Sequence, residues 1–222
     1  MNVTIFQNST YGASGLIGEF IAAKGWKSRR TIFPQDILAG DLQSFADDAV
    51  VFFGSPHGVY ETEIPWIARQ RQLMQTLLAQ GTPVFGVCFG GQLLATAAGG
   101  TVAPMGRRYR AWIGNEYAAE SVWQGPWLRW HGDFITLPET VEVFARDQGT
   151  VQAFQHGSGV GVQFHPEVSA ELLVGWERES DPTDAASVAA YKVARKIAVE
   201  KSDEIRQRAF ALFDHVFERI TR

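Results

Sequence analysis

The sequence contains a single cysteine, Cys88, among its 222 residues. No disulfide can form within one copy of the chain, and a metal site built from several cysteines is excluded for the same reason. A chain without disulfides suits a reducing compartment, so we expect a cytoplasmic protein.

Membrane-directing segments and an excess of positive charge are also missing. The N-terminus has no basic segment followed by a long apolar stretch, and no part of the chain is apolar for long enough to span a bilayer. The formal net charge is −4, which gives no basic field of the kind that nucleic-acid binding requires. We therefore expect neither a membrane nor a nucleic acid as a partner.

The first part of the chain alternates between short apolar runs and helix-like segments. We expect strands at 3–6, 29–33, 50–53 and 84–87, with helices at 14–24 and 66–80. This alternation predicts a mostly parallel central sheet with flanking helices and right-handed crossovers. With 45% hydrophobic residues, the chain is long enough to bury a substantial core, and we expect one α/β domain over 1–222.

The second half of the chain has a different pattern of apolar and polar residues. Short β-like runs at 111–118, 134–137 and 151–154 are separated by Gly and Pro, and we expect them to extend the sheet with antiparallel strands. The last stretch, about 184–222, is rich in Ala, Lys, Arg and Glu and carries apolar residues at helical spacing. It is predicted to form a helical tail in one or two segments.

The segment around Cys88 carries the strongest local signal. An apolar strand runs into Gly86-Val-Cys88-Phe-Gly90, and a helical stretch at 93–98 follows. Small residues two before and two after a nucleophile permit a tight strand-to-helix turn that exposes its side chain, and the helix N-terminus favours the thiolate. A lone cysteine beside apolar residues is ordinarily a buried core thiol, but the flanking glycines favour a nucleophile here.

A nucleophilic thiol needs a histidine partner, and His165 has the most suitable context. It ends an apolar strand in Gln163-Phe-His165-Pro-Glu167, and the following proline biases His165 toward an extended backbone. Residues two apart in extended chain project to the same side, so Glu167 can hold the tautomer and orientation of the imidazole. The tripeptide alone could be a surface turn, but together with the cysteine turn it predicts a Cys88–His165–Glu167 triad.

With these segments the sequence resembles the class I glutamine amidotransferases, whose hallmarks are similar to 86–92 and 163–167. The likeness extends from the first strand to about Ser169 and is strongest to stand-alone proteins that resemble the amidotransferase domain of GMP synthase. It implies a flavodoxin-like α/β fold in which Cys88 is the nucleophile, His165 the acid and base, and Glu167 the orienting carboxylate.

The resemblance also implies an oxyanion hole. Phe53-Gly54-Ser55-Pro56 is similar to the family's Gly-Gly-Pro turn, whose backbone N–H stabilises the developing charge together with the N–H that follows the nucleophile. In this chain the two donors are the N–H groups of Ser55 and Phe89, with Gly54 beside the substrate. Ser55 replaces a glycine that is common in the family, and a backbone donor tolerates the change where the dihedral angles suit serine.

Three further residues are implied to contact the substrate. Trp130-His131-Gly132-Asp133 resembles the family's His-Gly-Asp segment, which lies by the α-amino and α-carboxyl groups, so the resemblance assigns His131 and Asp133 to that end. Gln92 is similar to the family's substrate-contacting glutamine, whereas Gly91 stands where many members have histidine.

No cofactor or metal site is expected. Gly12-x-x-Gly15-x-x-Gly18 lacks the spacing of a dinucleotide-binding loop and is interpreted as a glycine-rich turn, and the remaining histidines have no metal-ligand spacing. Arg107, Arg108 and Arg110 form a small basic cluster that is interpreted as a solvated face, with docking of a partner as the alternative.

Two functions use the same triad. The first is an amidotransferase subunit that hydrolyses glutamine and delivers ammonia to a separate synthetase or acceptor enzyme, since the chain has no ATP-binding signature. The second is a stand-alone γ-glutamyl hydrolase or peptidase. A non-catalytic protein of this fold is disfavoured by the intact triad, and a thiol α/β hydrolase offers no reason for Gln92 and the His-Pro-Glu segment.

Overall fold

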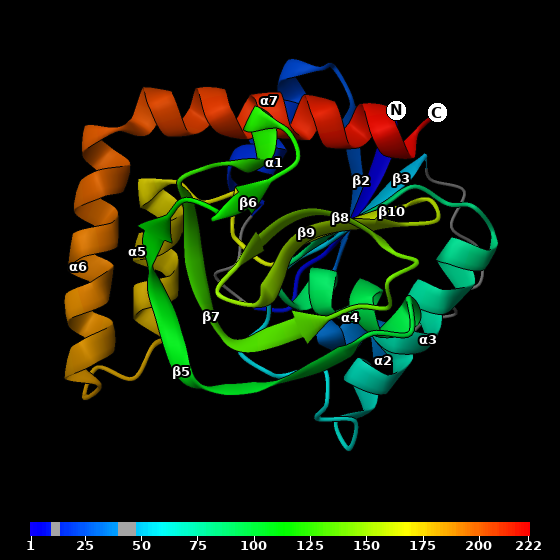
Figure 1. The fold of residues 1–222 in the computed structure, drawn as a ribbon, viewed down its shortest axis with the longest axis horizontal. Helices are drawn as coiled ribbons and strands as arrows, with labels where there is room; N and C mark the ends of the chain where they lie inside the picture. The colour runs from blue at the N-terminus through cyan, green and yellow to red at the C-terminus, as the bar shows by residue number, and fades with distance from the viewer. Residues whose placement is uncertain (10–13, 40–47) are drawn as a thin grey trace.

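The central sheet has eight strands in the order β2-β1-β3-β4-β10-β9-β8-β6 (Figure 1). The computed structural model describes residues 1–9, 14–39 and 48–222. The strands are β1 (Asn2–Phe6), β2 (Lys27–Ile32), β3 (Ala49–Phe52), β4 (Val84–Val87), β6 (Tyr117–Ala118), β8 (Glu142–Asp147), β9 (Thr150–His156) and β10 (Gly159–Val162). The five strands from β2 to β10 pair in parallel, and the remaining pairs are antiparallel. The expected mostly parallel sheet is confirmed.

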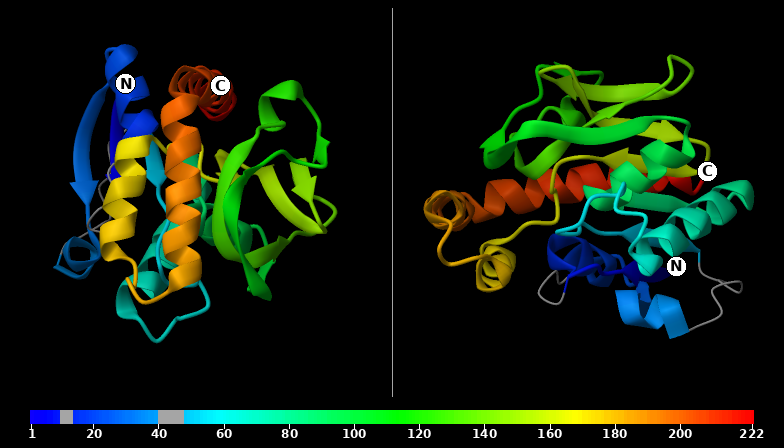
Figure 2. Two further views of the ribbon diagram at one scale, coloured as in Figure 1. Left: turned by 90° about the vertical axis from the view of Figure 1, so that its left-hand side faces the viewer. Right: turned by 90° about the horizontal axis from the view of Figure 1, so that it is seen from below.

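Helices cover both faces of this sheet and form two hydrophobic cores (Figures 1 and 2). The helices are α1 (Gly15–Ala23), α2 (Pro34–Ala39), α3 (Pro65–Ala79), α4 (Phe89–Ala97), α5 (Ala170–Glu179), α6 (Ala185–Glu200) and α7 (Ser202–Ile220). One core packs α1 and α7 against the sheet, and the other packs α3 and α4 against the opposite face. β3 shows the division, because Val51 belongs to the first core whereas Val50 and Phe52 belong to the second.

The region 110–154 was only partly predicted correctly. β6, β8 and β9 do extend the central sheet with antiparallel strands, but β5 (Thr101–Ile113) and β7 (Trp127–Thr136) pair with each other in a separate two-stranded sheet. The expected run 111–118 therefore spans the end of β5 and all of β6. Alternation of apolar and polar residues identifies strands but does not say which sheet they join.

The C-terminal tail forms two helices, α6 and α7, as expected, but α5 was missed. Ser169 caps α5 through its hydroxyl, which accepts a hydrogen bond of 3.3 Å from the backbone N–H of Leu172. α5 and α6 stand side by side, and α6 lies between α5 and the β5–β7 sheet (Figure 2). Among the described residues, no helix is long and apolar enough to cross a membrane.

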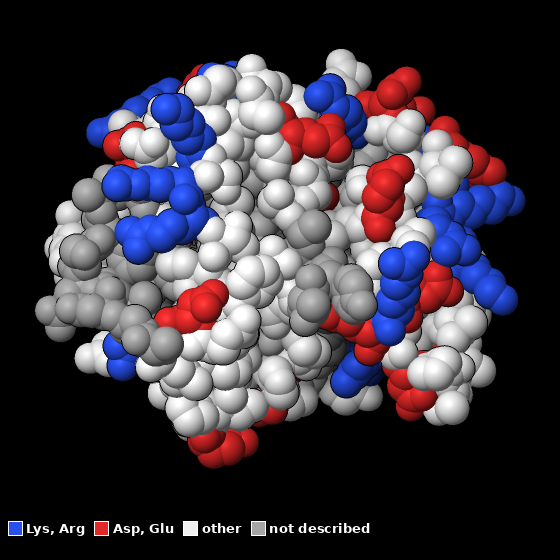
Figure 3. Space-filling view, turned by 180° about the vertical axis from the view of Figure 1, so that it is seen from behind, with Lys and Arg blue, Asp and Glu red and all other residues white. Residues whose placement is uncertain are grey.

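Charged side chains of both signs occupy the face shown in Figure 3. Lys and Arg lie there in separate groups with Asp and Glu between them, so the described residues of this face form no continuous basic surface.

Removal of one aromatic side chain on the buried face of α7 should destabilise the protein strongly. Phe213 is fully buried, and its ring centroid lies 5.5 Å from that of Phe20 and 6.3 Å from that of Phe85. Phe213→Ala should lower the free energy of unfolding by about 3–5 kcal/mol, because it leaves a cavity at this junction. The matched control is Val193→Ala on the outer face of α6, where the side chain is 61% exposed and the change should stay within about 0.5 kcal/mol. Urea denaturation followed by tryptophan fluorescence measures both, and equal effects would contradict the assigned core.

Candidate active site

Cys88 lies on a sharp turn between β4 and α4. Its backbone has φ 51° and ψ −106°, a positive φ that non-glycine residues rarely adopt. Two backbone hydrogen bonds hold the turn: Cys88 N–H donates to the Val162 carbonyl at 2.8 Å, and Gln92 N–H donates to the Cys88 carbonyl at 2.8 Å. The backbone geometry is that of a nucleophile turn.

Glycines around Cys88 permit backbone contacts that no other residue would allow. A Cβ on Gly90 would lie 2.2 Å from the Phe52 carbonyl oxygen, and one on Gly86 would lie 2.5 Å from the Gly90 carbonyl carbon. A Cβ on Gly91 would lie 2.5 Å from the Val162 carbonyl oxygen. Gly91 therefore lets α4 pack directly on the end of β10, at a position where a histidine side chain would have to displace that strand.

The thiol is less exposed than the sequence suggested. The turn was expected to expose the side chain, but Cys88 is only 6% exposed and counts among the core residues. It nevertheless lines a cavity of about 850 Å³. The thiol is accordingly accessible through this cavity and hidden from the outer surface.

His165 and Glu167 lie together beside the thiol. Nδ1 of His165 is 2.8 Å from Oε1 of Glu167, and the two residues are 4% and 2% exposed. A Cβ on Gly54 would lie 3.1 Å from Cε1 of His165 and 4.0 Å from Sγ of Cys88, so the imidazole and the thiol face the same glycine. The backbone N–H of His165 donates to the Leu128 carbonyl at 2.8 Å and fixes its position.

The charges of Glu167 and Cys88 favour the protonated, imidazolium form of His165. Burial lowers the pKa of His165, but the negative charges of Glu167 and Cys88 outweigh it and raise the pKa to about 10. Nε2 of His165 is buried and has no hydrogen-bond partner among the described residues. The ring is thus positioned by Glu167 at one nitrogen and free to act at the other.

Glu167 is held in place by the start of α1. The N–H of Leu16 donates to the Glu167 carbonyl at 2.9 Å, and a Cβ on Gly15 would lie 2.2 Å from the same oxygen. Gly15 also has φ +49°, which favours glycine. Gly12, the first glycine of the turn noted in the sequence, lies outside the described residues.

The side-chain amides of two glutamines form a chain of hydrogen bonds from the thiol to Asp133. Nε2 of Gln163 donates to Sγ of Cys88 at 3.5 Å, and Nε2 of Gln92 lies 3.2 Å from Oε1 of Gln163 and 3.3 Å from Oδ2 of Asp133. The Tyr60 hydroxyl donates to the other carboxylate oxygen of Asp133 at 3.1 Å. Burial and the negative charge of Asp133 raise the pKa of Tyr60, so its hydroxyl stays protonated.

The remaining expected residues border the same cavity, apart from Phe89. Gly54 and Ser55 follow β3, and the Ser55 hydroxyl accepts a hydrogen bond of 3.0 Å from the His57 N–H. Phe89 is the first residue of α4, so its backbone N–H has no partner within the helix. Ser55 thus borders the cavity, and Phe89 directly follows Cys88 in the turn.

His131 is neutral and buried at this site. Burial, with smaller contributions from the positive charges of His165 and Arg129, lowers the pKa of His131 to about 3. Nδ1 lies 2.9 Å from the Asp133 carbonyl, and since a carbonyl only accepts, the single ring proton must be on Nδ1. Nε2 is left as a buried acceptor without a partner among the described residues.

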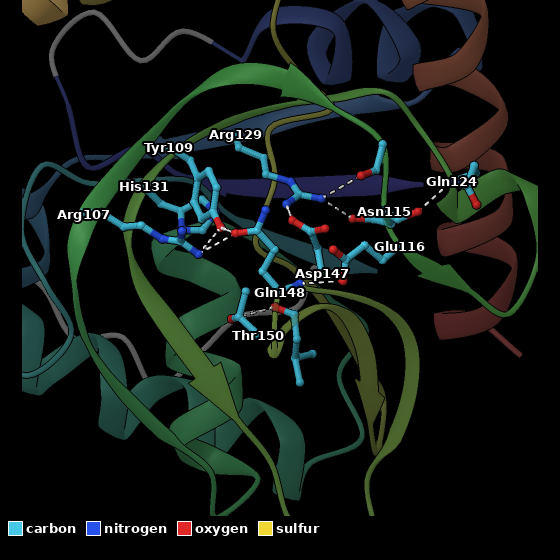
Figure 4. Close-up of polar contacts among 12 residues, drawn as sticks. Arg107, Tyr109, Asn115, Glu116, Gln124, Arg129, His131, Asp147, Gln148 and Thr150 are labelled. Carbon is cyan, nitrogen blue, oxygen red and sulfur yellow. Dashed lines mark hydrogen bonds and ion pairs between the residues drawn. The ribbon is translucent and has the colours of Figure 1, made fainter.

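A buried arginine, Arg129, lies close to Tyr109 and His131 (Figure 4). Arg129 is fully buried, forms an ion pair with Asp147 and donates to Oδ1 of Asn115 at 2.8 Å. Its guanidinium lies 5.7 Å from the centroid of the Tyr109 ring, which lies 5.4 Å from the ring of His131. This network joins β7, which carries His131, to the antiparallel edge of the central sheet.

Sequence reasoning missed several residues of this site. Gln163 was quoted only as part of a motif, although strand alternation places it on the same side as His165 and could have identified it. Tyr60, Arg108 and Trp176 were missed because only the packing of distant segments brings them to the cavity. Within the described ranges, no group of three or more His, Cys, Asp or Glu side chains could hold a metal ion.

Comparison with known proteins agrees with this architecture. The family model "Glutamine amidotransferase class-I" matches residues 26–173. A GMP synthase [glutamine-hydrolyzing] from Thermomicrobium roseum is 32% identical over 186 residues, which are 80% of this chain and 34% of that protein. A γ-glutamyl-L-1-hydroxyisopropylamide hydrolase from a Pseudomonas species is 34% identical over 170 residues, covering 67% of this chain and 57% of that protein. The chain thus spans about a third of the synthase.

Solved structures show the same fold over the whole chain. A glutamine amidotransferase from Thermotoga maritima superposes with a TM-score of 0.80 at 21% identity and covers 100% of this chain and 98% of its own. One from Methylobacillus flagellatus gives a TM-score of 0.81, also at 21% identity, with 100% and 96% covered. From the family match over most of its length, this chain belongs to the class I glutamine amidotransferases.

Proposed function

We propose that this protein hydrolyses the γ-carboxamide of a γ-glutamyl compound, in the first instance glutamine, through a thioester on Cys88. The observation that carries the proposal is the arrangement of thiol and imidazole against Gly54, with Glu167 bound to Nδ1 and with Nε2 left without a partner in the part of the chain that the structure describes. A nucleophile, a base and an orienting carboxylate in this order are the requirements of covalent acyl transfer.

The first half of the reaction forms the acyl-enzyme. The Cys88 thiolate attacks the γ-carbonyl carbon, and the backbone N–H groups of Ser55 and Phe89 stabilise the oxyanion. The high pKa of His165 keeps a proton on its ring at neutral pH, and Nε2 transfers that proton to the leaving nitrogen. The C–N bond breaks, ammonia leaves, and a γ-glutamyl thioester remains on Cys88.

The second half of the reaction hydrolyses the thioester and releases glutamate. Neutral His165 takes a proton from a water molecule, which attacks the thioester carbon, and the C–S bond breaks to give glutamate and the thiolate. Glu167 holds the ring in one orientation throughout, while the amide of Gln163 donates to the sulfur. His131 and Asp133 bind the α-amino end of the substrate in this scheme.

A separate synthetase or acceptor enzyme is the expected recipient of the ammonia. The curated relative named GMP synthase is about three times as long as the region that this chain matches, so the synthetase activity of such a protein needs sequence that the match does not include.

A stand-alone γ-glutamyl hydrolase is a second candidate, and the cavity favours it. Cavities of ~300–1,000 Å³ accommodate drug-sized ligands, and this one, at about 850 Å³, exceeds the needs of glutamine. The Pseudomonas relative, by its name, cleaves a substituted γ-glutamyl amide. Release of glutamate from glutamine and from substituted γ-glutamyl amides by the isolated protein separates the two candidates.

Replacement of the nucleophile should abolish hydrolysis. Cys88→Ala should reduce kcat on glutamine by on the order of 10⁶, because no other group can form the acyl-enzyme. An electrophilic glutamine analogue should add one γ-glutamyl group to the wild-type protein and none to the variant, as measured by intact-protein mass spectrometry. The variant should retain the circular dichroism spectrum of the wild type, and undiminished turnover in a folded variant would refute the proposal.

His165 and Glu167 should differ in their effect on rate and on its pH dependence. His165→Ala should be nearly as damaging as the cysteine change, whereas Glu167→Gln should leave residual activity. Because the charge of Glu167 raises the pKa of His165, Glu167→Gln should lower that pKa and move the alkaline limb of the kcat/KM profile to lower pH. His156→Ala, outside the cavity, is the matched control. An alkaline limb that stays in place, or activity lost in His131→Ala and kept in His165→Ala, would show that the wrong pair was chosen.

Asp133 should bind the α-ammonium group of the substrate. Asp133→Asn keeps size and accepting capacity but removes the charge, so loss of ~1.5–3 kcal/mol of charge-assisted hydrogen bonding should raise KM for glutamine roughly tenfold or more. Tyr60→Phe removes one donor to Asp133 without changing its charge and should raise KM less. Steady-state kinetics should be paired with alkylation of Cys88 by a small neutral reagent. A variant with unaltered KM, or one whose thiol no longer reacts, would assign Asp133 a structural role instead.

A further inference from the structure

The lining of the cavity defines two ends, one formed by the loop after β3 with Gln92 and Asp133, and the other by residues of α5 and α6. A γ-glutamyl group that reaches Gln92 and Asp133 fills the end next to β3 and β7. The cavity continues past His165 to α5 and α6, where it is lined by Trp130, Trp176, Glu179, Asp181, Asp184 and Tyr191. A γ-glutamyl group bound at the first end does not occupy this second end.

His165 determines which end receives the leaving group. Its Nε2 is buried, has no partner among the described residues, and belongs to a ring that lines the cavity. The Trp176 ring packs against the His165 ring edge to face, with centroids 4.8 Å apart and planes at 72°. A nitrogen that takes its proton from His165 must lie close to the imidazole, which Trp176 packs against, so a substituent on that nitrogen can contact Trp176.

Aromatic rings line the second end of the cavity. The rings of Trp130 on β7 and Tyr191 on α6 have centroids 4.3 Å apart, and Trp176 lies on α5. Tyr191 is 5% exposed, and its burial raises its pKa to about 12, so it presents a neutral ring. Tryptophan and tyrosine rings attract organic cations through their faces.

Negative charge predominates at the same end. Glu179, Asp181 and Asp184 line this end, and among the described residues the guanidinium of Arg110 pairs with Asp184 at 3.1 Å. Asp181 accepts hydrogen bonds from Thr183, and Glu179 accepts one from the Ser9 hydroxyl at 2.6 Å.

The other two arginines of the basic cluster have different neighbours. Arg107 is bound to Tyr109 and Gln148, and the Arg108 side chain packs beside Gly132, next to the glutamyl end. The α5–α6 end of the cavity therefore combines aromatic faces with a net negative charge.

We propose that this end is a subsite for the amine portion of a γ-glutamyl amide, and that it selects an amine with a second, positively charged group, as in a γ-glutamyl diamine. The inference rests on the proposed acyl chemistry of Cys88 and adds its substrate class. The C–N bond of the amide breaks as the C–S bond of the thioester forms. The proton of His165 goes to the released amine nitrogen, and water then cleaves the thioester to glutamate.

Three amides of equal chain length test the preference. γ-Glutamylputrescine, γ-glutamylbutylamide and γ-glutamyl-γ-aminobutyrate end in an ammonium, a methyl and a carboxylate, and kcat/KM for each is compared with that for glutamine. The ammonium compound should be hydrolysed at least about tenfold more efficiently than the other three, a preference that cation–aromatic contact and opposite charge together supply. A preference for the carboxylate compound, or equal kcat/KM for all four, would overturn the proposal.

Substitutions at the α5–α6 end of the cavity test whether that end produces the substrate preference. Asp181→Asn should lower kcat/KM for γ-glutamylputrescine severalfold more than for γ-glutamylbutylamide, and Trp176→Ala should lower it for both. Asp203→Asn on the exposed first turn of α7 is the matched control and should leave the ratio of the two substrates unchanged. An unchanged ratio in Asp181→Asn as well would exclude this end as the selecting surface. Wild-type protein that hydrolyses glutamine without the preference contradicts only the subsite, whereas protein inactive on every γ-glutamyl compound contradicts the acyl chemistry itself.

Discussion

The contact between the backbone of the Cys88 turn and the two neighbouring strands is the constraint on which the whole site depends. Gly90 packs on the Phe52 carbonyl, and Cys88 N–H donates to the Val162 carbonyl. Phe52 and Val162 are the last residues of β3 and β10. The segments that follow them carry Gly54 and Ser55 on one side and Gln163 to Glu167 on the other. One set of close contacts therefore sets the distance from the thiol to both of its supporting loops, and the glycines are needed because any Cβ would push the strands apart.

Burial of charge is the second requirement, and the surrounding hydrogen bonds offset only part of its cost. A buried ion pair is stabilising only where its remaining polar groups are satisfied and its geometry is fixed. The backbones of His165 and Glu167 are anchored by the carbonyl of Leu128 and the N–H of Leu16, but Nε2 of His165 and Oε2 of Glu167 are buried without a partner among the described residues. The neutral state of His131 also limits the amount of buried charge at the site. A second imidazolium next to His165 would oppose the first, and burial removes that charge by lowering the pKa of His131 to about 3.

Local signals predicted the parts of the site that are local in the chain. The strand before Cys88, the glycines around it and the proline after His165 act through neighbouring residues, so β4, the turn and the placement of Glu167 near the imidazole could be read from the sequence. The exposure of the thiol could not, because the cavity walls come from distant segments. The separate β5–β7 sheet was missed for a similar reason. The Arg129–Asp147 pair joins β7 to β8, and α6 packs against β5. These contacts join segments far apart in the chain, so the apolar pattern of β5 and β7 does not reveal them.

The division of the cavity follows a division of the chain. The family match ends at residue 173, and the residues proposed for acyl chemistry all lie before that point. Trp176, Asp181 and Tyr191 lie after it, on α5, α6 and the loop between them. A fold that is shared by many activities does not fix the substrate, which is set by what is built around the reacting atoms. Ammonia is small and needs no shaped wall beside His165. The Trp176 ring packs directly against that histidine, and it contacts the leaving group only when that group is large enough to touch it.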